Sequence, residues 1–150
     1  MGGLIEVRLV VALFVIAFAV GIPAYLDYRK RSKVGEGLEA AALARDAITK
    51  AFVSGGPADM SQRAVTGYVS PSAGEIVQRI TVAKSGTITI SYSEAVGYEH
   101  ERVIQVVPVA NGKALDLSEP ASKGAKLEWQ CGGDAGRTTV PKTYRPQSCR

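Results

Sequence analysis

The sequence is poor in the residues that build metal and catalytic centres. It has one histidine, His100, and two cysteines, Cys131 and Cys149, whose spacing is not that of a zinc site. It also lacks a glycine-rich phosphate-binding loop and the motif that presents a catalytic serine on a sharp turn. We therefore expect no metal ion, no cofactor and no enzymatic activity.

A strong excess of one charge sign is also absent. The 150 residues include 18 Lys and Arg against 14 Asp and Glu, a formal net charge of +4. Spread along the chain, this mild excess does not by itself indicate nucleic-acid binding. The length is sufficient for one domain with a hydrophobic core, and no internal repeat is present.

Polar side chains are missing altogether from residues 9–22. As a helix this run is about 21 Å long, and extension back to Leu4 gives about 28 Å but includes Glu6 and Arg8. A secretory signal peptide is disfavoured, because no small-x-small cleavage pattern is followed by a plausible mature start and an acidic residue precedes the apolar run. The segment is predicted to be a hydrophobic helix that serves as a membrane anchor.

Glu6 and Arg8 are unusual in such a segment, because an ionisable residue there normally needs a partner. Two residues apart on a helix, they point in different directions and are not expected to pair within one chain. One interpretation is that Glu6 meets another copy of the chain. The alternative is an ordinary helix-start residue in the headgroup layer, favoured by the helix dipole.

Gly21–Pro23 ends the apolar run, and the helix is predicted to kink or loosen there. Tyr25 and Tyr28 follow at the position of an interfacial aromatic belt. A basic cluster comes next, made of Arg29, Lys30, Arg31 and Lys33. By the positive-inside rule, this cluster predicts that the rest of the chain lies in the cytoplasm.

The cysteines point to the opposite compartment. Cys131 and Cys149 enclose a polar, turn-rich segment, which favours a disulfide and an oxidising environment. Closing that loop is expected to stabilise the fold by about 3 kcal/mol. The two inferences about topology therefore conflict.

Beyond the basic cluster, residues 32–54 are predicted to continue the helix. Its apolar positions recur at spacings of three and four and should pack on a sheet: Val34, Leu38, Ala41, Ala44, Ile48 and Phe52. Gly55, Gly56 and Pro57 should end the helix. A connecting loop is expected over residues 58–75, with a candidate short strand at 64–69.

Alternating residues predict four antiparallel strands, at 75–83, 87–92, 102–110 and 125–131. Pro108 suggests that the third of them is an edge strand or carries a bulge. One long helix packed on a four-stranded antiparallel sheet is an α+β architecture, here with a C-terminal disulfide-bounded loop.

Taken together, these residues resemble the type IVa pilins, the major subunits of bacterial type IV pili. The resemblance is carried by LIEV around Glu6, by the apolar run to IP, and by AYLDYRKRSKVGEGLEAAALARDAI after it. The family has a glutamate fifth in the mature chain and a proline seventeen residues later, an interval that Glu6 and Pro23 keep. The likeness is strong over residues 4–52 and looser beyond.

The resemblance implies a short basic leader that is removed after a glycine and that sets the topology in place of the basic cluster. This would resolve the conflict. The start Met-Gly-Gly departs from the glycine–phenylalanine junction of the family. Trimming of Met1 would make Gly2 the first residue and Glu6 the fifth, and we expect an altered or recombinant N-terminus.

By the same resemblance, residues 1–31 form a protruding hydrophobic helix, both membrane anchor and filament core, and residues 32–150 form a globular head. The expected assembly residues are Gly2, Glu6, Arg8 and Pro23. The Glu6 carboxylate would neutralise the terminal amine of a neighbouring subunit, since a buried charge is tolerated only when paired. Arg8 would need an acceptor in the assembled core, such as Glu6 of another subunit.

The implied function is that of a structural subunit in a helical filament of identical subunits. Before assembly it would lie in the inner membrane with its head in the periplasm, and pilus assembly machinery would build it into an extracellular pilus. Surface adhesion, twitching motility and DNA uptake would follow. The alternatives are a pseudopilin of a type II secretion system and a single-span, membrane-anchored extracytoplasmic binding module.

The cysteine loop is a candidate binding surface, because exposed loops on rigid scaffolds often carry function. Its candidate residues are Arg137, Lys142, Tyr144 and Arg145. Their chemistry would suit a host-surface glycan, an abiotic surface or DNA. The alternative is a stapled C-terminus with solvated charges.

Overall fold

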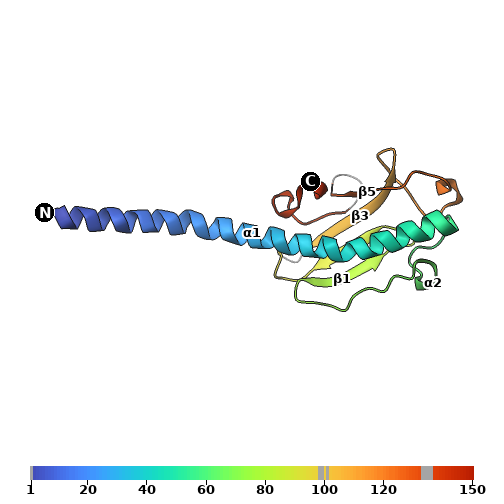
Figure 1. The fold of residues 1–150 in the computed structure, drawn as a ribbon, viewed down its shortest axis with the longest axis horizontal. Helices are drawn as coiled ribbons and strands as arrows, with labels where there is room; N and C mark the ends of the chain where they lie inside the picture. Colours follow the sequence, from blue (N-terminus) through green and yellow to red (C-terminus); the bar gives the residue numbers. More distant parts are fainter. Residues whose placement is uncertain (1, 98–99, 101, 133–136) are drawn as a thin grey trace.

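The computed structural model describes residues 2–97, 100, 102–132 and 137–150. A single long helix dominates it (Figure 1). The C-terminal half of this helix lies across one face of an antiparallel sheet, and the N-terminal half extends away from the sheet with no other element beside it. The predicted α+β architecture is confirmed.

Helix α1 (Gly2–Gly55) is unbroken over 54 residues, with Pro23 inside it. The helix does not break at Gly21–Pro23, where a kink or loosening is predicted, although proline at this position removes one backbone donor from the helix. The predicted end is confirmed. Gly56 takes φ +77° and donates its N–H to the carbonyl of Phe52 at 2.9 Å, a left-handed cap that glycine adopts without strain.

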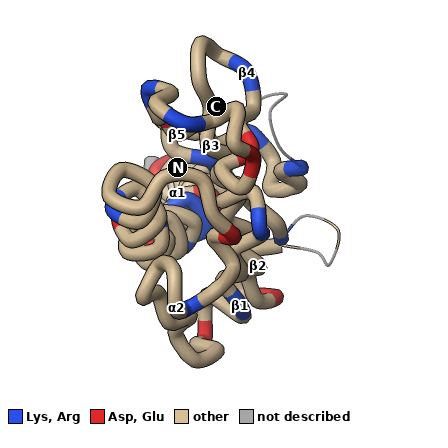
Figure 2. Tube along the Cα trace, turned by 90° about the vertical axis from the view of Figure 1, so that its right-hand side faces the viewer, with Lys and Arg blue, Asp and Glu red and all other residues tan. Residues whose placement is uncertain are grey.

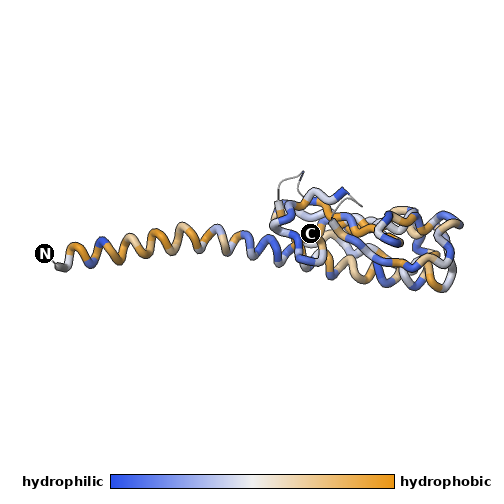
Figure 3. The backbone as a smooth tube through the Cα atoms, turned by 90° about the horizontal axis from the view of Figure 1, so that it is seen from above, coloured by the Kyte–Doolittle hydropathy of each residue, from blue (hydrophilic) through white to orange (hydrophobic). Residues whose placement is uncertain are grey.

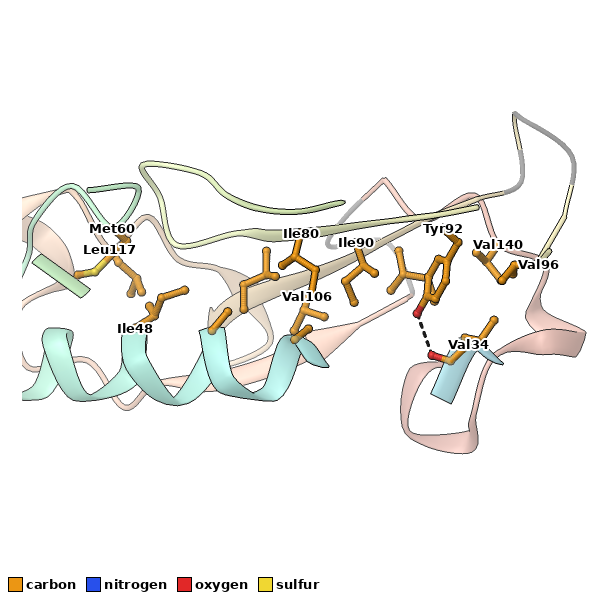
Figure 4. Close-up of a cluster of buried hydrophobic side chains, with 14 of the residues drawn as sticks. Val34, Ile48, Met60, Ile80, Ile90, Tyr92, Val96, Val106, Leu117 and Val140 are labelled. Atoms are coloured by element: carbon orange, nitrogen blue, oxygen red, sulfur yellow. Dashed lines mark hydrogen bonds between the residues drawn. The ribbon is translucent and has the colours of Figure 1, made fainter. Parts of the chain in front are cut away.

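The apolar stripe of α1 packs on the sheet as predicted. Its buried members are Val34, Ala41, Ala44, Ile48 and Phe52, and Leu38 is half-buried beside them. Figure 4 shows side chains of this stripe meeting those of the strands, Ile80, Ile90 and Val106 among them. Burial of these side chains holds the helix and the sheet together as one core.

The four predicted strands are confirmed with shorter bounds: β1 (Val77–Val82), β2 (Ile88–Tyr92), β3 (Val103–Ala110) and β5 (Glu128–Cys131). All neighbouring pairs are antiparallel. A fifth strand, β4 (Lys113–Ala114), was not predicted, because two residues cannot show an alternating pattern. Its turn, Asn111–Gly112, has positive φ at both residues and is a strong hairpin signal that the sequence did contain.

Strand β3 is the centre of the sheet, so the interpretation of Pro108 as an edge or bulge residue was wrong. Val106 pairs with Ile88 of β2 on one side and with Cys131 of β5 on the other. Pro108 accepts a hydrogen bond from Leu115 at 2.8 Å, beyond the last paired residue of β2. Proline has no N–H to donate, but β2 has already ended at this position, so no hydrogen bond to β2 is lost. Proline can therefore occupy a central strand.

The candidate strand at 64–69 was also wrong. Residues Arg63–Thr66 form the short helix α2, which ends at Gly67 with φ +68°. Three short 3₁₀ helices complete the described chain: η2 (Pro120–Ser122), η4 (Lys142–Tyr144) and η5 (Gln147–Cys149).

One close contact joins α1 to the sheet next to the start of the buried stripe. The Tyr92 hydroxyl donates to the carbonyl of Val34 at 2.8 Å, as Figure 4 shows. Burial raises the pKa of Tyr92 above its ordinary value. The ring also lies against Gly37, where any Cβ would overlap it. Gly37 is thus a notch in the helix that admits the Tyr92 ring.

Candidate assembly segment and cysteine loop

The N-terminal half of α1 has apolar side chains on every side. All the large apolar side chains from Leu4 to Leu26 are at least half exposed, and the segment is long and apolar enough to cross a membrane. Figure 3 shows this half as a nearly continuous hydrophobic rod and the next part of the helix as hydrophilic. A helix that is hydrophobic all round requires apolar surroundings, a lipid bilayer or other proteins.

The predicted assembly residues lie along this rod. Glu6 and Arg8 are exposed near its N-terminal end, and neither makes an ion pair within the part of the chain that the structure describes. Gly2 begins the helix, and Pro23 is exposed within it. Their roles in assembly remain predictions.

The predicted disulfide between Cys131 and Cys149 is confirmed. Cys131 ends β5, Cys149 lies in η5, and the bond ties the C-terminus to the edge of the sheet. Gly132 follows Cys131 with φ +75°, and a Cβ there would overlap the carbonyl of Cys149. The loop can close only because this residue is glycine.

Arg145 does not offer its charge at the surface, so its prediction as a surface-loop residue was wrong. The side chain is buried, and its Nε donates to the carbonyl of Val140 at 2.6 Å. Nη2 donates to the carbonyl of Thr138 at 3.3 Å. Burial lowers the pKa of this guanidinium. Arg145 acts as an internal brace of the cysteine loop.

The other three predicted loop residues lie in two separate parts of the loop, one beside β3 and one on η4. Arg137 is exposed, and its backbone N–H donates to Oε1 of Gln105 on β3 at 2.6 Å. Lys142 is exposed on η4, and Tyr144 at the end of η4 is half-buried. Arg137 and Lys142 are therefore the two predicted loop residues whose charges stay in solvent.

The η4 segment is fastened to α1 at the point where the helix leaves the head. Lys30 Nζ lies 4.9 Å from the centre of the Tyr144 ring, and Arg31 Nη2 donates to the carbonyl of Thr143 at 3.0 Å. In the sequence, Lys30 and Arg31 are recognisable only as a topology signal. Their contacts with the cysteine loop join residues more than 110 positions apart, and no local pattern reveals such a pair.

A third member of the basic cluster also serves the head. Lys33 Nζ lies 3.5 Å from the carbonyl of Ala95, at the limit of a hydrogen bond. Three of the four cations after Tyr28 thus contact the head, whereas Arg29 contacts the ring of Tyr25 on the apolar side at 5.9 Å. Across the described residues, no group of three or more His, Cys, Asp or Glu side chains could hold a metal ion.

Several known proteins are similar to this chain over most of its length. The family model for pilins, proteins of bacterial filaments, matches residues 30–150. The fimbrial protein EcpC of Eikenella corrodens is 29% identical over 98% of this chain and 88% of its own length. A type IV major pilin protein, PilE1 of Neisseria gonorrhoeae, is 30% identical over 90% of this chain and 76% of its own length. A fimbrial protein of Neisseria meningitidis is 28% identical over 93% of this chain and 76% of its own length.

Proposed function

The chain belongs to the pilin family, and we propose that residues 1–31 hold it in the inner membrane before assembly and form the filament core afterwards. Pilins are structural, non-enzymatic subunits of type IV pili or fimbriae, and membership of the family implies a filament of identical subunits. Residues 32–150 would then be the periplasmic head, and later the outer surface of an extracellular pilus.

The observation that carries this proposal is the exposed apolar half of α1. A soluble monomer rarely exposes more than a few hundred square ångströms of contiguous apolar surface. Here Leu9, Leu13 and Phe18 are among many large apolar side chains that are more than half exposed. A bilayer before assembly and the helices of other subunits after it would both remove this surface from water.

Glu6 is proposed to control which neighbour each subunit accepts. An unpaired carboxylate in an apolar core is costly, so the core favours the arrangement that brings a cation to it. The terminal amine of a neighbouring subunit would supply that cation, and Arg8 would find its acceptor in the same way. Identical helices can otherwise slide along one another with little change in apolar contact.

The proposed roles of the chain at the cell surface depend on this assembly. With pilus assembly machinery to extend and retract the filament, the chain would support surface adhesion, twitching motility and DNA uptake. Arg137 and Lys142 are the loop cations exposed to solvent in the subunit and are therefore the candidates for contact with a glycan, an abiotic surface or DNA.

The proposal is tested by assembly in a pilus-competent bacterium that lacks its own major pilin. The chain is expressed with the host's leader fused directly before Gly2, and filaments are sheared from the surface and quantified. We expect filaments from the unchanged chain and a loss of at least tenfold in Glu6→Ala. Glu39→Ala is the matched control, because Glu39 is exposed on the head half of α1.

Absence of filaments from the unchanged chain, with the protein confined to the membrane fraction, would contradict the proposal and favour a membrane-anchored binding module. Equal filament yields from Glu6→Ala and Glu39→Ala would contradict the role of Glu6 alone. The N-terminal mass of the sheared material identifies the residue that begins the assembled subunit.

A further inference from the structure

The boundary between the apolar rod and the head carries cations from two distant parts of the chain. On α1, Arg29 is exposed and stacks toward Tyr25, and Lys30 follows it. Tyr25 and Tyr28 are 59% and 69% exposed, and Tyr28 borders a pocket that Glu75 and Ile76 of the head also line. Aromatic rings followed by cations are typical of a helix that crosses from hydrocarbon into the headgroup layer.

The head contributes to the same level through η4. Figure 1 shows the C-terminal segment beside α1 where the helix leaves the head. The contacts of Lys30 with Tyr144 and of Arg31 with Thr143 hold η4 there. Lys142 begins η4 and is exposed, so its charge is kept at the base of the head. The disulfide and Arg145 brace the segment that presents it.

The spacing along α1 places these cations at headgroup depth. Residues 9–26 contain no charged side chain. As a helix these 18 residues rise about 27 Å, which matches a hydrocarbon core of about 30 Å. Arg29 lies roughly one turn, about 5 Å, beyond that segment. With Arg8 at the other end of it, the helix has a cation near each face of a bilayer.

Acidic side chains do not cancel this charge. Asp27 is exposed one residue after the apolar segment, and Glu36 lies two turns further into the head half of α1. Glu75 of the head also lies near this boundary, because it lines a pocket together with Arg29, Lys33 and Glu36. Five cations, Arg29, Lys30, Arg31, Lys33 and Lys142, stand against the three acids Asp27, Glu36 and Glu75, so the boundary keeps a formal charge of +2.

We propose that Arg29, Lys30 and Lys142 form a cationic collar that binds the headgroup phosphates of anionic phospholipids in the leaflet from which the head emerges. The inference rests on the proposed function only in requiring that the apolar half of α1 spans a bilayer. It changes the role of the cysteine loop, because η4 would face the membrane before assembly instead of a distant receptor. The collar would set how deep the unassembled subunit sits.

The test uses the full chain in nanodiscs with equal amounts of phosphatidylglycerol and phosphatidylcholine. Native mass spectrometry counts the lipids that stay bound after release. We expect phosphatidylglycerol to be enriched at least fivefold, since one Lys or Arg near an anionic surface is worth about that factor. Arg29→Gln with Lys142→Gln removes two of the three collar cations and should lower that ratio severalfold, with Lys30 kept because it holds η4 through Tyr144. Figure 2 shows Lys and Arg residues on several sides of the head, so a control with the same loss of charge is available. Lys113→Gln with Lys123→Gln removes two exposed cations elsewhere on the head and should leave the lipid ratio unchanged.

Three results would overturn the proposal: equal retention of both lipids by the unchanged chain, full enrichment in the collar variant, or an equal loss in the control variant. Thermal unfolding of all three proteins shows whether the head stays intact. Because the unassembled subunit is measured, failure here leaves the filament proposal standing. A failed filament test would likewise leave the lipid result unaffected.

Discussion

The two halves of α1 share one unbroken helix and differ in everything that their side chains meet. From Val34 to Phe52, the apolar residues form a stripe, and the chain's own sheet covers it. From Leu4 to Leu26, apolar residues surround the helix, and no other helix or strand of the described chain lies beside them. The two halves therefore have the same backbone geometry and differ in how polar residues are distributed around the helix axis.

The transition between the halves is short and is built from polar contacts. Within a few residues, the helix passes from Tyr28, which is 69% exposed, to the fully buried Val34. Lys30 and Arg31 lie between them and fasten the cysteine loop to the helix. One half is thus stabilised inside the subunit, and the other half is left to be stabilised by its surroundings.

The largest expected difference between the halves is in the stability lost when an apolar side chain is truncated to alanine. Ile48→Ala removes a fully buried side chain from the core and should lower the free energy of unfolding of the head by about 2–5 kcal/mol. Leu13→Ala, in the exposed half, should change it by less than about 0.5 kcal/mol. Denaturant unfolding in detergent micelles measures both.

Trp129 is a suitable reporter of that unfolding, because its Nε1 donates to Oγ1 of Thr49, next to Ile48, at 3.1 Å. Fluorescence changes of the single tryptophan then follow separation of α1 from β5. Equal losses of stability in the two variants would show that the exposed half packs on the head in solution, which would contradict a difference between the two halves of α1.

The disulfide should affect only the head. A bond between residues 18 apart is expected to contribute about 3 kcal/mol, so Cys131→Ala with Cys149→Ala should destabilise the head by that amount. The measurement is denaturant unfolding of both proteins with and without reductant. Reductant should destabilise the unchanged chain and leave the double variant unaffected. No response of the unchanged chain would contradict a stabilising disulfide.

Two glycines near the transition should respond to alanine with opposite signs. Gly37→Ala places a Cβ into the Tyr92 ring, and overpacking of this kind costs about 1–3 kcal/mol. Gly35→Ala meets nothing within 4 Å, and alanine in a helix is favoured over glycine by up to about 1 kcal/mol. Stability should therefore fall in the first variant and rise in the second.

Thermal unfolding of the two glycine variants gives the comparison directly. A shift of the same sign in both would mean that helix propensity outweighs the contact with Tyr92. The absorbance of Tyr92 at high pH adds a second check, because burial raises its pKa. Gly37→Ala should bring that titration closer to the ordinary range if the ring is displaced from the helix.

Local periodicity was enough to predict α1, its buried stripe and the four main strands, because each is long enough to show its period at least twice. It failed for β4, α2 and Pro108, where two or four residues carry no period or where a strand's neighbours decide the outcome. The disulfide could be predicted because the chain has only two cysteines, which leaves one pairing. A larger number of cysteines would have allowed several different pairings.

The site was predicted less completely than the fold. Glu6 and Pro23 could be singled out because a charge or a proline conflicts with its apolar neighbours. The fastening of η4 to Lys30 and Arg31 could not, because long-range contacts between polar groups leave no local pattern. Arg145 was misplaced for the same reason, since only the folded loop supplies the carbonyls that bury it.

The smallest expected effect concerns Asp59, just beyond the buried end of α1. Glu6, near the other end, is proposed to take its partner from another subunit, whereas Asp59 has donors in its own loop. The Ser61 hydroxyl donates to it at 2.6 Å and Gln62 Nε2 at 3.2 Å, and these bonds lower the pKa of the Asp59 carboxyl.

Because the pKa of Asp59 is lowered in the folded state, its carboxylate stabilises the fold at pH values above the ordinary carboxyl pKa of about 3.9. This contribution is lost as the pH falls through the lowered pKa of Asp59. Ser61→Ala removes the strongest donor, so the pKa should move back up toward the ordinary range, as measured by carboxyl-carbon NMR titration. Ser54→Ala is the control, because the Ser54 hydroxyl donates to the carbonyl of Lys50 and not to Asp59. An unchanged titration in Ser61→Ala would show that the Ser61 hydroxyl does not lower the pKa of Asp59, which would contradict a carboxylate stabilised by this donor of its own loop.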